Sequence, residues 1–263
     1  MLGDALVIIS DAHLGYAFPG RDAPRRVEAV LLDFLDLVPR LGDSLLVNGD
    51  LFEFWFAYER VIPRGGFRAA AALAQLARRM PVLMVGGNHD RWGRAFWQRD
   101  VGLHFAPDRL EFSVGDRRGL ALHGDGIGYG RLRSGLLHRL VSSRLASAAY
   151  RALHPELGIP LVDALSARLG DHGTEGPTVD RAVAQQQAWA ERTLAERPEL
   201  GLIVLGHTHR PVLCEPAPGR QYLNPGAWFD GFRYAIATAR GAELRQFNPA
   251  EPPSPAIPPG DRR

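Results

Sequence analysis

Residues 5–13 read Ala-Leu-Val-Ile-Ile-Ser-Asp-Ala-His, an aliphatic run that stops at a carboxylate and an imidazole. A short apolar run that is rich in β-branched residues and bounded by polar ones is typical of a strand buried on both faces. Similar runs, each ending in glycine or a polar residue, recur at 44–49, 81–87, 120–124 and 202–206. The sequence therefore predicts a set of buried strands with polar residues at their carboxyl ends.

The segments between the first three strands have helical periodicity. Their apolar side chains form one stripe in each segment: Val27, Val30, Leu31, Phe34, Leu35 and Val38 in the first, and Phe67, Ala70, Leu73, Ala77 and Met80 in the second. Alternation of strand and helix indicates a largely parallel sheet with helices packed on it.

After residue 205 the pattern changes to closely spaced strand candidates at 220–223, 234–239 and 244–247. Close spacing without intervening helices indicates a terminal antiparallel portion. We therefore expect an α/β fold, built as a mixed sheet or as a two-sheet β-sandwich flanked by helices.

Two further segments define the expected domain organisation. The stretch 126–198 is helix-like throughout and interrupts the series of strands, which predicts a helical cap inserted into a domain of residues 1–247. The remaining residues, 248–263, are too rich in proline to pair as strands or to continue a helix. We expect this tail to be disordered.

The composition limits the classes of function. At 263 residues and 46% hydrophobic content, the chain can build one large α/β core. All 31 basic side chains are arginine, yet the formal net charge is only +2. This balance does not indicate a nucleic-acid-binding protein. The exclusive use of arginine reflects either codon bias or a use for guanidinium groups, which bind phosphate well.

The compartment can be inferred from cysteine usage and hydropathy. The single cysteine, Cys214, excludes an internal disulfide framework and fits a reducing compartment. The N-terminal residues lack the basic region and the long apolar region of a signal peptide. No apolar run approaches the ~18 to 20 residues that span a bilayer. We therefore expect a cytoplasmic protein.

Polar motifs stand at the ends of the predicted strands. They are Asp11-Ala12-His13, Gly49-Asp50, Gly87-Asn88-His89-Asp90, His123-Gly124-Asp125 and Gly206-His207-Thr208-His209. Ligands of open α/β sheets bind outside the carboxyl ends of the strands, so motifs on separate strands can converge there. Any one of these residues alone would more often be a turn former, a helix cap or a packing residue. Their joint occurrence beside glycines, which allow close backbone approach, indicates one site.

The residue types in these motifs indicate a metal centre. Carboxylate oxygen, amide oxygen and imidazole nitrogen together suit Mn²⁺, Fe²⁺ or Zn²⁺, whereas an all-oxygen set would suit Mg²⁺ or Ca²⁺. The candidate ligands are Asp11, His13, Asp50, Asn88, His123, His207 and His209. These are more than one ion needs, but they fit two ions that share a carboxylate, an arrangement that serves phosphoryl displacement.

These motifs resemble the calcineurin-like metallophosphoesterase superfamily, whose pattern D-x-H, G-D, G-N-H-D/E, H and G-H-x-H is complete in residues 11–209. The resemblance implies a metallophosphoesterase-type fold and two ligand sets: Asp11, His13, Asp50 and His209 for one ion, and Asp50, Asn88, His123 and His207 for the other. It implies that Asp50 bridges the two ions. It also implies that His89 is the acid that assists the leaving group or stabilises the transition state.

The second motif indicates a subfamily. Residues 49–55 read Gly-Asp-Leu-Phe-Glu-Phe-Trp and lack the G-D-x-x-D-R-G pattern of protein Ser/Thr phosphatases. This segment, the G-H-T-H-R-P run at 206–211 and Gly-Ala-Trp at 226–228 resemble the UDP-2,3-diacylglucosamine pyrophosphatases of lipid A synthesis. These enzymes release UMP and 2,3-diacylglucosamine 1-phosphate. The best-known branch of that family has arginine where this chain has His89.

Two features bear on the substrate, and each has two interpretations. Residues 126–155 contain five arginines, Arg131, Arg133, Arg139, Arg144 and Arg151, and no acidic residue. With leucines at helical spacing, this segment is either a basic amphipathic helix that contacts anionic lipid or a core-facing helix with a solvated basic face. The aromatic residues Phe52, Phe54, Trp55, Phe56 and Tyr58 either form the wall of an acyl or nucleobase pocket or pack between sheet and cap.

The leading hypothesis is therefore a hydrolase of UDP-2,3-diacylglucosamine that uses two divalent ions, Mn²⁺ in the first instance. Its expected partners are a phosphorylated small-molecule or lipid substrate and the inner face of the membrane, without an obligate protein partner. The enzymatic alternative is a phosphoesterase that acts on soluble nucleotides or phosphomonoesters. A non-catalytic scaffold would have no chemical reason to retain every ligand. A nuclease is disfavoured because no basic stripe with interleaved aromatics is evident.

Overall fold

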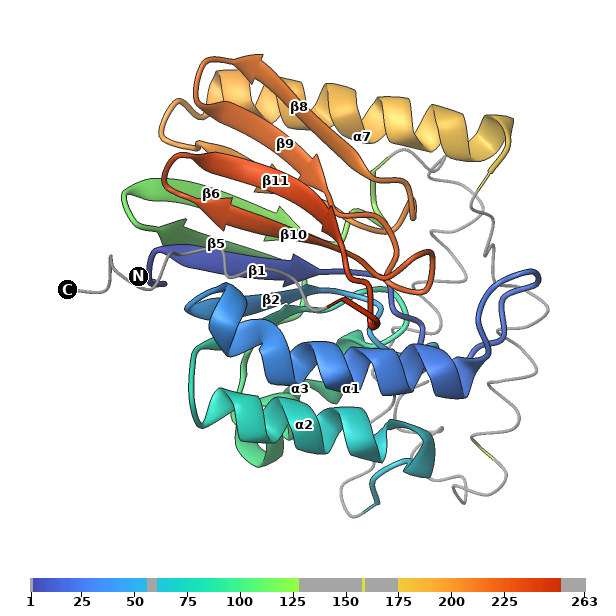
Figure 1. The fold of residues 1–263 in the computed structure, drawn as a ribbon. Helices are drawn as coiled ribbons and strands as arrows, with labels where there is room; N and C mark the ends of the chain where they lie inside the picture. Colours follow the sequence, from blue (N-terminus) through green and yellow to red (C-terminus); the bar gives the residue numbers. More distant parts are fainter. Residues whose placement is uncertain (1, 56–60, 128–157, 159–174, 252–263) are drawn as a thin grey trace.

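The computed structural model describes residues 2–55, 61–127, 158 and 175–251. In it, two β-sheets stack face to face, with α1 and α2 on one side of the stack and α7 on the other (Figure 1). Both sheets mix parallel and antiparallel pairs. The prediction of an α/β fold built as a mixed two-sheet sandwich is therefore confirmed.

The first sheet has six strands in the order β11-β10-β1-β2-β3-β4. Four of them pair in parallel: β1 (Ala5–Ile9), β2 (Ser44–Asn48), β3 (Val82–Val85) and β4 (His104–Ala106). The other two, β10 (Arg233–Thr238) and β11 (Gly241–Gln246), form an antiparallel hairpin that pairs with β1. The C-terminal part of the chain thus completes the sheet that its N-terminal part begins.

The second sheet has five strands in the order β5-β6-β7-β9-β8. Its central strands run in parallel: β6 (Arg117–Leu122), β7 (Leu202–Val204) and β9 (Arg220–Asn224). Its antiparallel edges are β5 (Arg109–Val114) and β8 (Val212–Ala217). The strand expected at 220–223 is therefore β9, which belongs to this sheet and pairs in parallel with β7.

The helices cover the outer faces of the two sheets. All six apolar positions predicted in α1 (Pro24–Leu41) are buried. In α2 (Phe67–Ala77) the prediction for Phe67 is wrong, because the buried face of this helix contains Ala69, Leu73 and Leu76 and leaves Phe67 57% exposed. Shorter helical pieces complete this side: η1 (Arg64–Gly66), η2 (Arg91–Gly93), α3 (Arg94–Phe96) and η3 (Trp97–Val101).

Strand β1 shows why the aliphatic runs have no polar face. Leu6 and Ile8 belong to the core between the two sheets, whereas Val7 and Ile9 belong to the core between the first sheet and its helices. A strand buried on both faces cannot alternate apolar and polar residues. These two apolar cores therefore lie on opposite faces of the first sheet, and the polar loops lie at the ends of its strands.

Helix α7 (Pro177–Glu196) is the longest described segment of the predicted cap. It packs on the second sheet, where Ala190 and Leu194 join Leu120, Ile203 and Tyr222 in one apolar cluster. Residues 128–157 and 159–174 of the predicted cap lie outside the described residues, and with them the five arginines of the segment 126–155. Residues 252–263 of the predicted tail also lie outside them. No described helix is long and apolar enough to span a membrane.

Candidate metal centre

The candidate ligands lie in loops that follow strands of both sheets. Asp11 and His13 follow β1, Asp50 follows β2, Asn88 follows β3, His123 follows β6, and His207 and His209 follow β7. Side chains in these loops form groups whose ligand atoms lie within 4.8 Å of one another: Asp11, His13 and His209; Asp50, His123 and His207; and His13, Asp50 and His89. The convergence expected from the sequence is therefore present in the structure.

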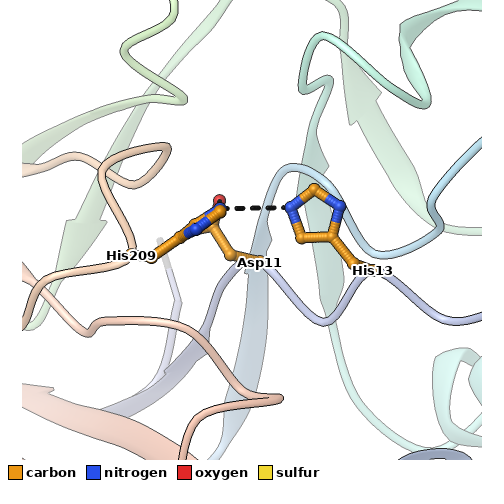
Figure 2. Close-up of side chains that lie close together, drawn as sticks. All are labelled: Asp11, His13 and His209. Atoms are coloured by element: carbon orange, nitrogen blue, oxygen red, sulfur yellow. Dashed lines mark hydrogen bonds and ion pairs between the residues drawn. The ribbon is translucent and has the colours of Figure 1, made fainter. Parts of the chain in front are cut away.

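The first group consists of Asp11, His13 and His209, which point toward one another (Figure 2). The Nε2 atoms of His13 and His209 are 3.2 Å apart, and His209 Nε2 is 3.5 Å from Asp11 Oδ1. All three side chains are buried. Two imidazole nitrogens that face a buried carboxylate form a set of donors that suits a divalent cation.

The second group is centred on Asp50. Its Oδ2 atom is 2.9 Å from His123 Nε2 and 3.8 Å from His13 Nε2, so Asp50 reaches both groups. The rings of His123 and His207 lie 5.2 Å apart between their centroids. Among the described residues, the buried Oδ1 atom of Asn88 has no hydrogen-bond partner. A buried amide oxygen without a donor is costly unless a cation binds it, so Asn88 suits a further ligand beside the group of Asp50, His123 and His207.

Five of the candidate ligands have left-handed backbone conformations. Their φ angles lie between 43° and 69°, a region that residues other than glycine rarely adopt. The five residues are Asp11, His13, Asp50, His207 and His209. Such strain costs on the order of 1 to 3 kcal/mol per residue and is concentrated at functional sites. The surrounding fold therefore holds these side chains where relaxed loops would not place them.

Burial controls the charge states in the centre. Burial alone would lower the pKa of His123, but the charge and hydrogen bond of Asp50, together with the charges of Asp11 and Asp125, outweigh burial and raise this pKa to about 10. Burial raises the pKa of Asp11 to about 6, and Asp50 adds to the effect. Burial, with the charge of His123, lowers the pKa of His207 to about 4. The carboxylates thus attract positive charge, while a neutral His207 has the lone pair that a metal ligand needs.

His89 lies beside the two groups at a more exposed position. Its side chain is 15% exposed, its ring centroid is 4.9 Å from that of His13, and its backbone N–H donates to Asp50 Oδ1 at 2.9 Å. Burial lowers its pKa, so a protonated His89 would release its proton readily. This position suits either a further ligand or an acid that faces the substrate.

Three residues that support the ligands were not predicted from the sequence. The Glu53 carboxylate lies 2.9 Å from His13 Nδ1, and the Ser10 hydroxyl donates to the Asp11 carboxylate. Asp90, buried between two loops, accepts hydrogen bonds from the backbone of Leu51 and Gly87. Asp90 belongs to a strand-end motif, Ser10 directly precedes one and Glu53 follows one by three residues, so their polarity within buried segments was the available signal.

A more distant support comes from α7. The buried Gln186 side chain donates to the carbonyl of Gly206 at 3.1 Å and of Gly124 at 3.4 Å. These glycines belong to the loops that carry His207 and His123. Nothing in the local sequence marks Gln186, because its partners are far away along the chain.

The aromatic residues near the centre have two different surroundings. The rings of Phe18 and Phe229 stack with their centroids 3.5 Å apart. Their centroids lie 5.7 and 5.8 Å from that of the His13 ring. Phe52 and Trp55 are buried and pack on Trp97, which favours the packing interpretation for that part of the aromatic run. Phe56 and Tyr58 lie outside the described residues.

Comparison with known proteins gives the family. The family model for calcineurin-like phosphoesterases matches residues 5–211, which include every candidate ligand. The chain belongs to the calcineurin-like phosphoesterase family. It is accordingly a metal-dependent hydrolase, and the superfamily suggested by its motifs is confirmed.

Individual relatives agree with this assignment. The chain is 26% identical over 241 residues to a UDP-2,3-diacylglucosamine hydrolase of Porphyromonas gingivalis, covering 86% of this chain and 91% of that protein. It is 26% identical over 252 residues to one of Escherichia coli, covering 92% and 99%. Among solved structures, a dimetal phosphatase from Danio rerio matches with a TM-score of 0.51 at 13% identity, covering 94% and 100%. This last similarity concerns the fold alone.

Proposed function

We propose that the protein hydrolyses the pyrophosphate bond of UDP-2,3-diacylglucosamine and releases UMP and 2,3-diacylglucosamine 1-phosphate, a step of lipid A synthesis. The observation that carries the chemistry is the pair of buried ligand groups that Asp50 joins. The substrate is inferred from the relatives of that name, which match this chain over most of their length. The proposed place of action is the cytoplasmic face of the membrane.

Two divalent cations fit the residues present. Asp11, His13, Asp50 and His209 would hold one, and Asp50, Asn88, His123 and His207 would hold the other. We propose Mn²⁺, with Fe²⁺ and Zn²⁺ as alternatives, because the donors mix oxygen with imidazole nitrogen. When bound, such ions supply positive charge for phosphate oxygens and lower the pKa of a water molecule.

The residues of the chain have separable roles in this proposal. Hydrogen bonds of Gln186 and Asp90 would hold the ligand loops in their strained conformations. His89, at the more exposed edge of the centre, would donate a proton to the leaving phosphate oxygen or stabilise the charge that develops there. Phe18 and Phe229 shield His13 and His209 from solvent on one side.

A soluble nucleotide or phosphomonoester is the second candidate substrate. The observation that favours it is His89, which matches the general superfamily pattern and differs from the arginine of the best-known pyrophosphatase branch. The metal chemistry would be the same for both substrates.

The deciding experiment compares substrates with the Mn²⁺-loaded protein. We expect rapid release of UMP from UDP-2,3-diacylglucosamine in detergent and slow hydrolysis of p-nitrophenyl phosphate and of its diester. Faster turnover of the simple esters or of soluble nucleotides would instead support the second candidate. Metal analysis should find two ions per chain; one ion at saturating Mn²⁺ would count against the two-metal proposal.

Asp50→Asn serves as the inactive reference in this assay. Because Asp50 reaches both ligand groups, we expect its loss to lower turnover more than tenfold, or more than about 1.4 kcal/mol of barrier. Asp36→Asn, an exposed change on α1, is the matched control. Turnover of Asp50→Asn within tenfold of the parent would contradict a bridging role.

A further inference from the structure

Glu53 occupies an unusual place between two histidines of different proposed roles. It lies in the loop after β2, where its backbone N–H donates to the carbonyl of Leu14 and the N–H of Trp55 donates to the carbonyl of His89. This loop is therefore fixed both to the segment that carries His13 and to the segment that carries His89. The Glu53 side chain is only 9% exposed, although it could carry a negative charge.

The first contact of Glu53 determines which nitrogen of His13 carries a proton. His13 Nδ1 is 2.9 Å from Glu53 Oε2, and an ionised carboxylate only accepts hydrogen bonds. Nδ1 must therefore be the donor. Nε2 is then the nitrogen with the lone pair, and it is the one that faces Asp50 at 3.8 Å and His209 at 3.2 Å.

The second contact does the same for His89. Its Nδ1 lies 2.5 Å from the backbone carbonyl oxygen of Glu53, which is also only an acceptor. Nδ1 of His89 is therefore a donor too, and Nε2 is the nitrogen turned away from Glu53. The carboxylate of Glu53 is a second neighbour of the same ring, with Oε1 3.8 Å from Nδ1.

We propose that Glu53 is a positioning residue that fixes the orientation and the Nδ1–H tautomer of both His13 and His89, through its carboxylate for the first and mainly through its backbone carbonyl for the second. The role in catalysis rests on the proposed function. A carboxylate behind a ligating histidine orients the ring and raises its basicity, and losing such a partner typically weakens metal binding by 10- to 100-fold.

The division between side chain and backbone makes the proposal testable. A change of the Glu53 side chain removes the acceptor for His13 but keeps the carbonyl that holds His89. Metal binding in the group of Asp11, His13 and His209 should then suffer more than binding in the group of Asp50, His123 and His207. A merely structural role would weaken both groups together.

The experiment measures Mn²⁺ binding to the full chain without any substrate, for Glu53→Gln, Glu53→Leu and the parent. We expect the affinity for one ion to fall about 10- to 100-fold in Glu53→Leu, with the other ion changed much less. Glu53→Gln keeps a hydrogen-bond acceptor for His13, so its loss of Mn²⁺ affinity should be smaller. Glu111→Leu, a change of an exposed glutamate on β5, should bind as the parent does. The Co²⁺ absorption spectrum should change in the Glu53 variants and not in the control.

Turnover supplies a second reading. The loss of turnover in Glu53→Gln should become smaller as the Mn²⁺ concentration is raised, because the contact of His89 with the backbone carbonyl of residue 53 remains. Parental affinity for both ions in Glu53→Gln and Glu53→Leu would overturn the inference, as would an equal loss of both ions. If Glu53→Leu does not fold, Glu53→Gln decides by the same criteria. An inactive parent with two bound ions would instead refute the proposed substrate and leave the metal-binding result intact.

Discussion

Gly87 packs directly on the carboxylate of Asp50. A Cβ atom built on Gly87 would lie under 3.0 Å from Asp50 Oδ1, a separation that real Cβ atoms essentially never show. The backbone of the loop after β3 therefore approaches the central carboxylate as closely as a glycine allows. The close approach couples the loop of Asn88 and His89 to the position of Asp50.

This contact predicts the effect of Gly87→Ala. The added methyl group must displace either Asp50 or the Asn88 loop, so we expect bound Mn²⁺ to decrease and turnover to fall at least about tenfold, or about 1.4 kcal/mol. Gly65→Ala is the control, because nothing lies within 4 Å of a Cβ atom there. Metal analysis together with a turnover assay checks the prediction. Full metal content and parental turnover in Gly87→Ala would show that the contact is readily relieved.

His89→Ala should separate catalysis from metal binding. We expect turnover to fall by about 10²- to 10⁴-fold, on the order of 3 to 5 kcal/mol, because a positioned proton donor is lost. Metal content should stay near that of the parent, since all seven proposed ligands remain. His104→Ala, an exposed change on β4, controls for the loss of an imidazole. Metal lost in proportion to turnover would make His89 a ligand, an arrangement that its proximity to His13 and Asp50 also allows.

The parts of the fold that could be predicted from the sequence are those with local signals. The buried run of β1 has no polar face, and the stripe on α1 repeats at helical spacing, so each indicates its structure without its neighbours. The candidate ligands were found for a related reason. Polar residues that directly follow buried parallel strands lie at the carboxyl ends of those strands, and they share one edge of the sheet whatever the order of its strands.

The parts that were missed depend on tertiary context. Strand β5 is an exception, because its alternation of buried Leu110, Phe112 and Val114 with Glu111 and Ser113 is a local strand signal, although it lacks the continuous apolar run of the predicted strands. Strand β8 contains Pro216, which is tolerated because β8 is the edge of its sheet. Gln186 has no local signature, since its role depends on the carbonyl groups of Gly124 and Gly206, which lie in loops of the second sheet.

Gln186→Leu should destabilise the protein through those loops. Leucine is similar in size but leaves the carbonyls of Gly206 and Gly124 without this donor, so we expect a loss of about 1 to 3 kcal/mol in the free energy of unfolding. Chemical denaturation of the metal-free protein measures it. Gln185→Leu, an exposed change on the same helix, should alter the stability much less. Equal stability of the two variants would mean that Gln186 is not needed to hold the loops.

The basic segment at 126–155 separates the two candidate substrates. Replacing Arg131, Arg133 and Arg139 by glutamine removes three cations from a stretch without acidic residues, at about 1 kcal/mol per charge near an anionic membrane surface. We expect kcat/KM for UDP-2,3-diacylglucosamine to fall by about one to two orders of magnitude, or about 1.4 to 2.7 kcal/mol. Turnover of a small soluble ester should survive, because it depends on the metal centre and His89 alone. A parallel loss on both substrates would indicate a general phosphate-binding or structural role, and no loss on either would favour the soluble substrate.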